Sequence, residues 1–360
     1  MEKMIALFNH KGGVSKTTTT FNLGWIMARQ GAKVLLIDAD PQCNLTSLAL
    51  SLPDESAFEE LYNRKNSNDI FSLVRPMMIE ARKDISRNEP ISNIVETKQK
   101  NLYILPGHLE IEEFSTQITL ALELGVSKSF SMMTGVPGYL NYALRELANI
   151  HKIDYVLIDM APSLSGLNEV LLMSSDYFIA PCSPDFFSEI ALKNLSRVIP
   201  EWYDKISGFN DRGPSLTIPC ATKFLGVVQQ KYRPRKRTGS DNPNQPTVAF
   251  ENWINRVREA TNGFLVPALK KKALAVEEEQ FTAIVKDQQP YNLSLVSDFN
   301  SLVAVSQMQN KPVFELTRED LRSGAAVFGP SLETMEENVR RFNDVFEDLA
   351  NKIVSLTKLT

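Results

Sequence analysis

The stretch MIALFNHKGGVSKTT, residues 4–18, joins an apolar run to a loop with two adjacent glycines and then to the start of a helical pattern. The apolar run, residues 4–8, is typical of a strand buried on both faces. Helix-forming residues continue over 16–30, and Gly31 follows as a residue suited to a helix end. Such a loop directs backbone N–H groups and the positive end of the helix dipole to one place, which favours a bound phosphate. The stretch therefore predicts a strand, a phosphate-binding loop and a helix in succession.

Two side chains of the loop have the chemistry that a nucleotide site requires. Lys16 would reach the β- and γ-phosphates, and the Thr17 hydroxyl would ligate Mg²⁺. The usual pattern G-x-x-x-x-G-K-[ST] is not met, because His10 and Ser15 stand where it has glycine. The alternative interpretation is a Gly-Gly turn before a helix that carries Lys and Thr by chance.

Outside this stretch, short apolar runs alternate with helical patterns along the chain. The runs lie at residues 33–38, 102–105, 155–158 and 177–180, with weaker ones at 224–228 and 291–296. This alternation favours an α/β fold, in which a doubly wound and mostly parallel sheet carries helices on both faces.

We expect a single domain over residues 1–360, enlarged by helical and loop insertions at 51–100 and 231–290. Within the second insertion, residues 253–260 and 266–279 have helical patterns. A final helix is predicted over 331–357, where these apolar residues follow helical spacing: Phe342, Val345, Phe346, Leu349 and Ile353. The polar face of this helix is acidic and anionic lipid would repel it, so we expect the apolar stripe to pack in the core and predict no membrane role.

Carboxylates follow two of the buried runs. Asp38 and Asp40 lie in the sequence DADPQ, residues 38–42, and Asp159 follows the run at 155–158. The carboxyl ends of parallel strands meet at one edge of a sheet, so these groups would face the crevice that holds the phosphate loop. An acidic residue at such a strand end typically holds the Mg²⁺ shell. The alternative for each residue alone is a turn or a helix cap.

Composition excludes several classes of protein. The chain is 43% hydrophobic and 23% charged, which is ordinary globular composition. A formal charge of −4, from 39 basic and 43 acidic residues, excludes a polyanion binder with an overall basic field but allows a local basic patch. Three scattered cysteines without a CxxC pair give no support for a zinc ribbon, an iron–sulfur site or a disulfide framework. With no signal peptide and no apolar run of about 18 residues, we expect a cytoplasmic protein.

The chain resembles the ParA/MinD ATPases in three motifs. Residues 11–18, KGGVSKTT, resemble the deviant phosphate loop of that family, residues 38–42 its second motif, and residues 158–162, IDMAP, its Walker B segment. Weaker likeness extends over 101–106, 177–195 and 291–316. The family has glycine where Ser15 stands. No winged-helix region precedes the loop, so the chain looks unlike ParA proteins that are also operator-binding repressors.

This resemblance implies a P-loop NTPase fold, ATP as substrate, Mg²⁺ as cofactor and a homodimer that forms with ATP. It assigns the nucleotide to Lys11, Gly12, Gly13, Val14, Ser15, Lys16, Thr17 and Thr18. Catalysis is assigned to Lys11, Lys16 and Asp40, where Lys11 crosses to the partner subunit's ATP and Asp40 positions the attacking water. The metal shell is assigned to Thr17, Asp38 and Asp159. Gln42 and Pro162 would shape segments that sense the γ-phosphate.

A dense basic cluster is the candidate DNA contact. It consists of Lys231, Arg233, Arg235, Lys236 and Arg237. Contact with DNA phosphates and a merely solvated loop are equally good interpretations. Residues 270–272, three lysines, are a second candidate, although three glutamates follow closely at 277–279. For the adenine, residues 229–232 and 297–300 are candidates because they follow late strands.

The function that these features favour is a ParA-like ATPase of plasmid or chromosome partition or of cargo positioning. It would bind DNA non-specifically with ATP, associate then with the nucleoid, and hydrolyse ATP when stimulated by a ParB-like or other adaptor. Three alternatives stay open. One is a metabolic ATP-dependent enzyme on the same fold, which would need a second substrate pocket. Another is a nitrogenase-reductase-like carrier, which would need a cysteine pair. The third is an ATP-binding switch that recruits a partner in a defence or conjugation module.

Overall fold

The structure is a computed structural model that describes residues 2–52, 54–62, 68–80, 94–124, 135–214, 216–234, 245–286, 289–325 and 328–358. Eight strands form one sheet: β1 (Lys3–Leu7), β2 (Val34–Ala39), β3 (Val95–Glu96), β4 (Leu102–Leu105), β5 (Tyr155–Met160), β6 (Tyr177–Cys182), β7 (Lys223–Tyr232) and β8 (Asn292–Ser297). The spatial order is β3-β4-β2-β5-β1-β6-β7-β8. Neighbouring strands are parallel except β3, which pairs antiparallel with β4. The predicted α/β fold with a mostly parallel sheet is confirmed.

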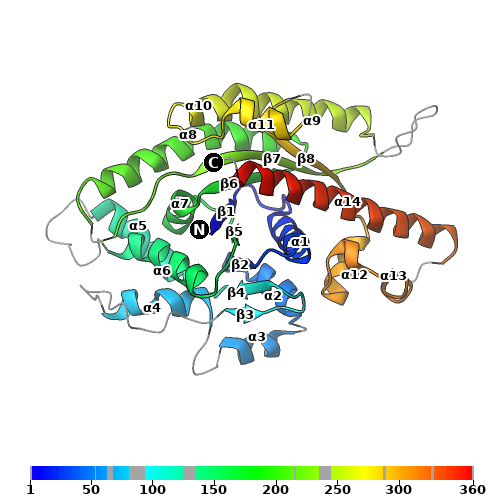
Figure 1. Ribbon diagram of the computed structural model, residues 1–360, viewed down its shortest axis with the longest axis horizontal. Helices are drawn as coiled ribbons and strands as arrows, with labels where there is room; N and C mark the ends of the chain where they lie inside the picture. Colours follow the sequence, from blue (N-terminus) through cyan, green and yellow to red (C-terminus); the bar gives the residue numbers. More distant parts are fainter. Residues whose placement is uncertain are drawn as a thin grey trace.

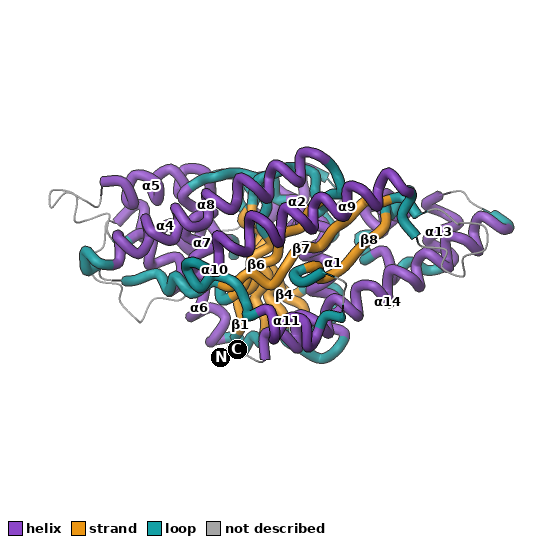
Figure 2. The backbone as a smooth tube through the Cα atoms, turned by 90° about the horizontal axis from the view of Figure 1, so that it is seen from above, coloured by secondary structure: helices purple, strands orange, loops and turns teal. Residues whose placement is uncertain are grey.

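Helices cover both faces of this sheet (Figures 1 and 2). In the first part of the chain they are α1 (Lys16–Arg29), α2 (Asn44–Leu50), α3 (Glu55–Tyr62), α4 (Ile70–Glu80), α5 (Ile111–Leu124), α6 (Val136–Ile150), α7 (Gly166–Ser174) and α8 (Phe186–Asn210). They continue with α9 (Val248–Ala260), a π-helical turn (Thr261–Leu265), α10 (Val266–Lys270), α11 (Glu278–Ile284), α12 (Leu302–Gln309), a 3₁₀ turn (Val313–Glu315), α13 (Arg318–Ala325) and α14 (Pro330–Lys358). Figure 1 shows α1 and α14 on one side of β1, β2 and β5, and α5, α6 and α7 on the other.

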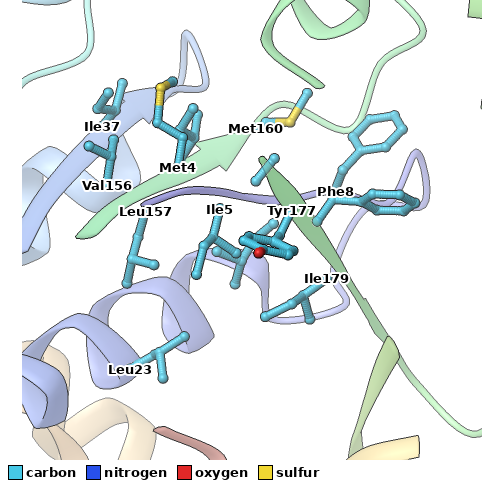
Figure 3. Packing of buried hydrophobic residues seen from close by; sticks show 14 of the residues in the cluster. Met4, Ile5, Phe8, Leu23, Ile37, Val156, Leu157, Met160, Tyr177 and Ile179 are labelled. Carbon is cyan, nitrogen blue, oxygen red and sulfur yellow. The ribbon is translucent and has the colours of Figure 1, made fainter. Parts of the chain in front are cut away.

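The core forms where the central strands are buried on both faces. In Figure 3, Met4 and Val156 point to one side of the sheet, whereas Ile5 and Leu157 point to the other side, toward Leu23 of α1. All four strand residues are fully buried. Helix α1 approaches the sheet closely at Gly24, where a Cβ atom would lie 2.6 Å from a methyl group of Leu36. This packing fixes the start of α1, and with it the phosphate loop, against the ends of β1, β2 and β5.

The helix predicted over residues 266–279 is wrong as one element. Helix α10 ends at Lys270, Ala273 has a left-handed φ of 56°, and α11 begins only at Glu278. Between them, residues 274–276 extend along the beginning of β7, where Phe224 donates to the Leu274 carbonyl and accepts from the amide of Val276. The backbone of these three buried apolar residues makes its hydrogen bonds to a strand. The spacing of apolar residues, which predicted a helix, gives no information about this distant partner.

The two regions predicted as insertions hold regular structure. Residues 51–100 contain α3, α4 and β3, and residues 231–290 contain α9, α10 and α11. Their assignment as insertions into one domain stays a prediction. Within the part of the chain that the structure describes, no helix has both the length and the apolar character needed to span a bilayer.

Candidate functional site

The predicted phosphate loop lies between the end of β1 and the start of α1, as an open turn with left-handed residues. Gly13 has φ 72° and Ser15 has φ 61° with ψ 33°. The Ser15 carbonyl accepts from the amide of Thr19 at 2.9 Å and from its hydroxyl at 2.7 Å, which starts the first turn of α1. Serine therefore holds the conformation that glycine adopts without strain, at a cost of about 1–2 kcal/mol. A Cβ added at Gly12 or Gly13 would meet no atom of the described residues within 4 Å, so the loop borders open space there.

This open space is part of a cavity of about 780 Å³ at the carboxyl edge of the sheet. Its volume suits a nucleotide-sized ligand. All the loop residues from Gly12 to Thr18 line it, together with Asp40, Gln42, Asn44 and Pro162 from the segments after β2 and β5. Late segments complete the lining with Lys231, Asp298, Phe299, Val303, Gln307 and Asn310, and α2 contributes Ser47 and Leu48.

Lys16 is buried at the base of the cavity, with only 7% of its surface exposed. Its ammonium donates to the backbone carbonyl of Asn9 at 3.1 Å. Burial lowers the pKa of Lys16, while the nearby carboxylates of Asp159 and Asp40 raise it in part. Among the described residues this is the one hydrogen bond of the ammonium, and its acceptor is neutral, so an anionic phosphate would stabilise the charge strongly.

Asp159 is a buried carboxylate at this edge of the sheet. It is the last residue but one of β5 and lies opposite Asp38 of β2 in the register. Both of its carboxylate oxygens are buried without a hydrogen-bond partner among the described residues. Burial raises the pKa of Asp159 from its ordinary value of 3.8 to about 8, and the neighbouring Asp38 adds to the rise. The Thr17 hydroxyl, which lies nearby but does not meet hydrogen-bond geometry, and the charge of Lys16 offset part of it. Two unused carboxylate oxygens near the Thr17 hydroxyl fit a Mg²⁺ ion that shares its remaining ligands with phosphate and water.

Asp38 lies opposite Asp159 near the end of the neighbouring strand, but its hydrogen bonds differ from those of Asp159. One oxygen accepts from both the amide of Thr46 at 2.8 Å and its hydroxyl at 2.7 Å, so the carboxylate fixes the start of α2. The amide of Gly107 donates to the same hydroxyl at 2.9 Å. Burial raises the pKa of Asp38 to about 6, and the Thr46 contacts lower it in part. Asp38 therefore bonds mainly to protein, and its role in the metal shell stays a prediction.

No group of three or more His, Cys, Asp or Glu side chains able to hold a metal exists among the described residues. The three cysteines do not form disulfides; Cys43 and Cys182 are buried and Cys220 is half-buried. A metal at this site would thus depend on the phosphates of a nucleotide for part of its coordination, as Mg²⁺ commonly does.

A protein-family model described as an AAA domain matches residues 2–210, more than half of the chain. The chain belongs to the ParA/MinD-type P-loop ATPases. The sporulation initiation inhibitor protein Soj of Bacillus subtilis is 29% identical over 201 residues, which cover 55% of this chain and 64% of Soj. The chromosome partitioning protein ParA of Caulobacter vibrioides is 30% identical over 197 residues, covering 55% and 62% of the two chains. The chain therefore spans less than two thirds of the length of these relatives.

Solved structures of low identity share the fold. Apo McdA from Cyanothece aligns over 95% of this chain and 99% of its own, with a TM-score of 0.57 and 17% identity. An aspartate-to-alanine variant of Cyanothece McdA in complex with ATP aligns over 94% of this chain and 96% of its own, with a TM-score of 0.55 and 18% identity. At such identities these similarities show the ParA/MinD-type fold and nothing finer.

In this ParA/MinD-type chain, Lys11 contacts the start of α8 within its own subunit. Its ammonium lies 2.6 and 2.7 Å from the two carboxylate oxygens of Asp185 and donates to the Ser188 hydroxyl at 3.1 Å. Asp185 also caps α8 by accepting from the amide of Ser188 at 2.8 Å. Sequence reasoning missed Asp185, although it follows the apolar run at 177–180 just as the predicted carboxylates follow theirs.

Asp40 lies between the nucleotide cavity and a second cavity of about 820 Å³. Its carboxylate accepts from the amide of Gln42 at 3.0 Å, and both residues line both cavities. The second cavity is walled by α5, α7 and the segment after β5, with neutral hydroxyl and amide groups at Ser115, Thr116, Thr119, Ser163, Ser165 and Asn168. None of the described residues that line it is a lysine or an arginine.

Of the residues at 229–232 and 297–300, some line the nucleotide cavity and others are buried in the core. Lys231, Asp298 and Phe299 line the cavity, in keeping with the residues considered for the adenine. In contrast, Gln229 is buried and donates to the Ile254 carbonyl and the Asn292 side chain, so it points away from the cavity.

The predicted DNA contacts are only partly described. Lys231 donates to the carbonyl of Gly13 at 2.7 Å, and Arg233 is exposed. Arg235, Lys236 and Arg237 lie outside the described residues. In the second basic cluster, Lys270 pairs with Glu278 at 3.0 Å and Lys272 with Asp204 at 2.6 Å. The assignment of either cluster to DNA stays a prediction.

Proposed function

We propose that this chain binds and hydrolyses ATP as a nucleotide-dependent homodimer. The observation that carries the proposal is the proximity of a buried ammonium, Lys16, to a buried carboxylate, Asp159. Among the described residues the ammonium has one hydrogen bond, to a neutral carbonyl, and the carboxylate oxygens accept none. Both groups lie at a loop whose backbone suits phosphate, and both carry a burial cost that a Mg²⁺-bound polyphosphate would relieve.

Each residue of the loop has a role in this proposal. The backbone of Gly12, Gly13, Val14 and Ser15 wraps the phosphates, Lys16 neutralises the β- and γ-phosphates, and Thr18 continues the helix N-terminus that faces them. Thr17 and Asp159 would hold Mg²⁺, which would supply positive charge to neutralise the polyphosphate, and Asp38 would support this shell from its bond to Thr46. Asp40 borders the same cavity and orients the attacking water.

The dimer gives Lys11 its function. In the family, the matching lysine reaches the ATP of the partner subunit, where it neutralises charge as the γ-phosphoryl group departs. For that, the ammonium must leave Asp185 and Ser188 of its own subunit. We therefore assign the Lys11–Asp185 pair to the free subunit and the crossed position of Lys11 to the ATP-bound dimer.

The cellular role that we propose is partition or cargo positioning by non-specific DNA binding of the ATP-bound dimer. Support comes from relatives named for chromosome partitioning and from the local basic cluster at 231–237 in an acidic chain. A dimer presents this cluster twice, and each DNA phosphate that it neutralises releases condensed counterions. The expected location is the nucleoid when ATP is bound, and the expected partner is a ParB-like or other adaptor that stimulates hydrolysis.

Fluorescence anisotropy on a long random-sequence duplex tests this role, at two salt concentrations and with ATP or ADP. We expect binding with ATP that weakens steeply as salt rises, and little binding with ADP. Replacing Arg233, Arg235 and Arg237 by Glu should lower DNA affinity and flatten the salt dependence while ATP binding persists. Absence of DNA binding with either nucleotide would contradict the partition role and favour a switch that recruits a protein partner.

A second candidate function is favoured by one observation, the cavity of about 820 Å³ that shares Asp40 and Gln42 with the nucleotide cavity. A metabolic enzyme would use such a space for a small substrate that accepts the γ-phosphoryl group. Its described lining carries two carboxylates, Asp40 and Glu112, and no lysine or arginine, which favours an uncharged or cationic substrate over an anionic one. Phosphate release that depends on a small molecule, and is insensitive to DNA and to dimerisation, would support this candidate over the first.

A further inference from the structure

Lys231 occupies an irregular position at the end of β7. The pairing of β7 with β8 shifts register between Gln230 and Tyr232, and Lys231 between them has a left-handed φ of 66°. The shift takes Lys231 out of the regular alternation of side chains along the strand. Its side chain therefore turns toward the phosphate loop, although the strand carries buried apolar residues along most of its length.

Two successive side chains of β7 tie this strand end to the nucleotide loop. The ammonium of Lys231 donates to the Gly13 carbonyl at 2.7 Å, and the amide of Gln230 donates to the hydroxyl of Thr19 in α1. Lys231 also lines the nucleotide cavity beside Asp298 and Phe299. Its ammonium is exposed to the cavity, in contrast to the buried ammonium of Lys16.

The cavity carries two cationic side chains among its described lining residues, Lys16 at its base and Lys231 at its rim. A neutral carbonyl is a weaker acceptor for an ammonium than an anionic phosphate oxygen. We propose that Lys231 is a nucleotide-binding residue, whose ammonium moves from the Gly13 carbonyl to the polyphosphate of a nucleotide in this cavity. This inference rests on the proposed ATP site, and it reassigns Lys231 from DNA to the nucleotide.

The position of Lys231 in the chain gives the contact a consequence. Arg233 follows two residues later, and the rest of the basic cluster follows Arg233 in the sequence. The Gly13 carbonyl already holds Lys231 at the phosphate loop without nucleotide, so a bound nucleotide would move the anchor of the cluster's first residue from the loop backbone to the phosphates. The occupancy of the cavity is thereby linked to the segment that we propose for DNA.

Calorimetric titration of ATP and ADP with Mg²⁺ tests the assignment on the full chain. Lys231→Met removes the ammonium but keeps most of the aliphatic stem, and it should weaken both nucleotides by about 10- to 100-fold, the effect of one charge-assisted hydrogen bond. Lys231→Arg should restore most of the affinity. The matched control is Lys223→Met, a charge removal at the other end of the same strand, which should leave both affinities unchanged.

Two outcomes would overturn the inference. One is an unchanged ATP affinity in Lys231→Met, and the other is an equal loss in Lys223→Met, which would indicate a general loss of positive charge. A loss of DNA affinity in Lys231→Met at saturating ATP, with unchanged ATP affinity, would return Lys231 to the DNA contacts. Titrations of wild type and of Lys16→Ala distinguish a wrong assignment of Lys231 from a wrong assignment of the ATP site. If wild type binds ATP and Lys16→Ala does not, the ATP site stands whatever Lys231 does.

Discussion

The ion pair between Lys11 and Asp185 predicts that the free subunit opposes its own dimerisation. Asp185→Asn removes the negative charge but keeps a side-chain oxygen that accepts from the Ser188 amide, so the cap of α8 survives. Lys11 then leaves its own subunit more easily, and we expect the ATP-bound dimer to form at lower protein concentration.

The exposure of the pair sets the size of this effect. The side chains of Lys11 and Asp185 are 21% and 39% exposed, so solvent screens much of their attraction. Partly exposed pairs of this kind contribute about 0.5–1 kcal/mol. A dimer breaks two such pairs, which amounts to about 1–2 kcal/mol, or a dimer dissociation constant about 5- to 30-fold lower in Asp185→Asn.

Sedimentation velocity over a protein concentration series, with ATP and Mg²⁺, measures this constant. The matched control is Asp204→Asn, because Asp204 lies on the same helix and pairs with Lys272 at 2.6 Å, away from the phosphate loop. We expect no shift for this control. A dissociation constant in Asp185→Asn that is unchanged or higher than in wild type would show that the Lys11–Asp185 pair does not oppose dimerisation. An equal gain in Asp204→Asn would assign the effect to net charge.

Three further predictions concern the loop and the buried carboxylate. Lys16→Ala should abolish ATP binding in calorimetry, since it removes the buried ammonium at the base of the cavity; unchanged affinity would reject the phosphate-loop assignment. Ser15→Gly should raise the free energy of unfolding by about 0.5–1 kcal/mol, because glycine adopts the left-handed φ of 61° without strain; denaturant titration measures it, and destabilisation would contradict it. The folded-state pKa of Asp159, about 8, lies above its ordinary 3.8, so the nucleotide-free protein should lose stability as pH rises from about 4 to 8, by up to about 1.4 kcal/mol per pH unit. Unfolding of Asp159→Asn at pH 6 and 8 should show a smaller loss than wild type, and an equal loss would contradict the role of Asp159.

Local sequence patterns predicted most of the sheet and the phosphate loop. Strands such as β2 and β5 are continuous apolar runs, and a carboxylate follows near the end of each run. The same stretch of sequence therefore predicts both the strand and the site residue. Ser15 shows that a residue which departs from the family pattern keeps the left-handed conformation of the loop.

Contacts between distant segments were beyond this kind of reasoning. Lys11 and Asp185 are 174 positions apart, and Lys231 and Gly13 are 218 positions apart, so no local pattern joins them. The difference between Asp38, which bonds Thr46, and Asp159, whose oxygens have no partner among the described residues, depends on which backbone packs beside each strand end. The helical pattern at residues 266–279 failed for the same reason, since the start of β7 offers those residues a strand-like partner.

We propose that ATP drives this chain into a dimer in which hydrolysis depends on Asp40. The most direct measurement is the molar mass of Asp40→Ala by light scattering coupled to size exclusion, with Mg²⁺ and either ATP or ADP. Slow turnover in this variant should preserve the ATP-bound state during the measurement. We predict a mass of about twice the 40.5 kDa of one chain with ATP and a mass near 40.5 kDa with ADP. The same mass with both nucleotides would contradict the claim.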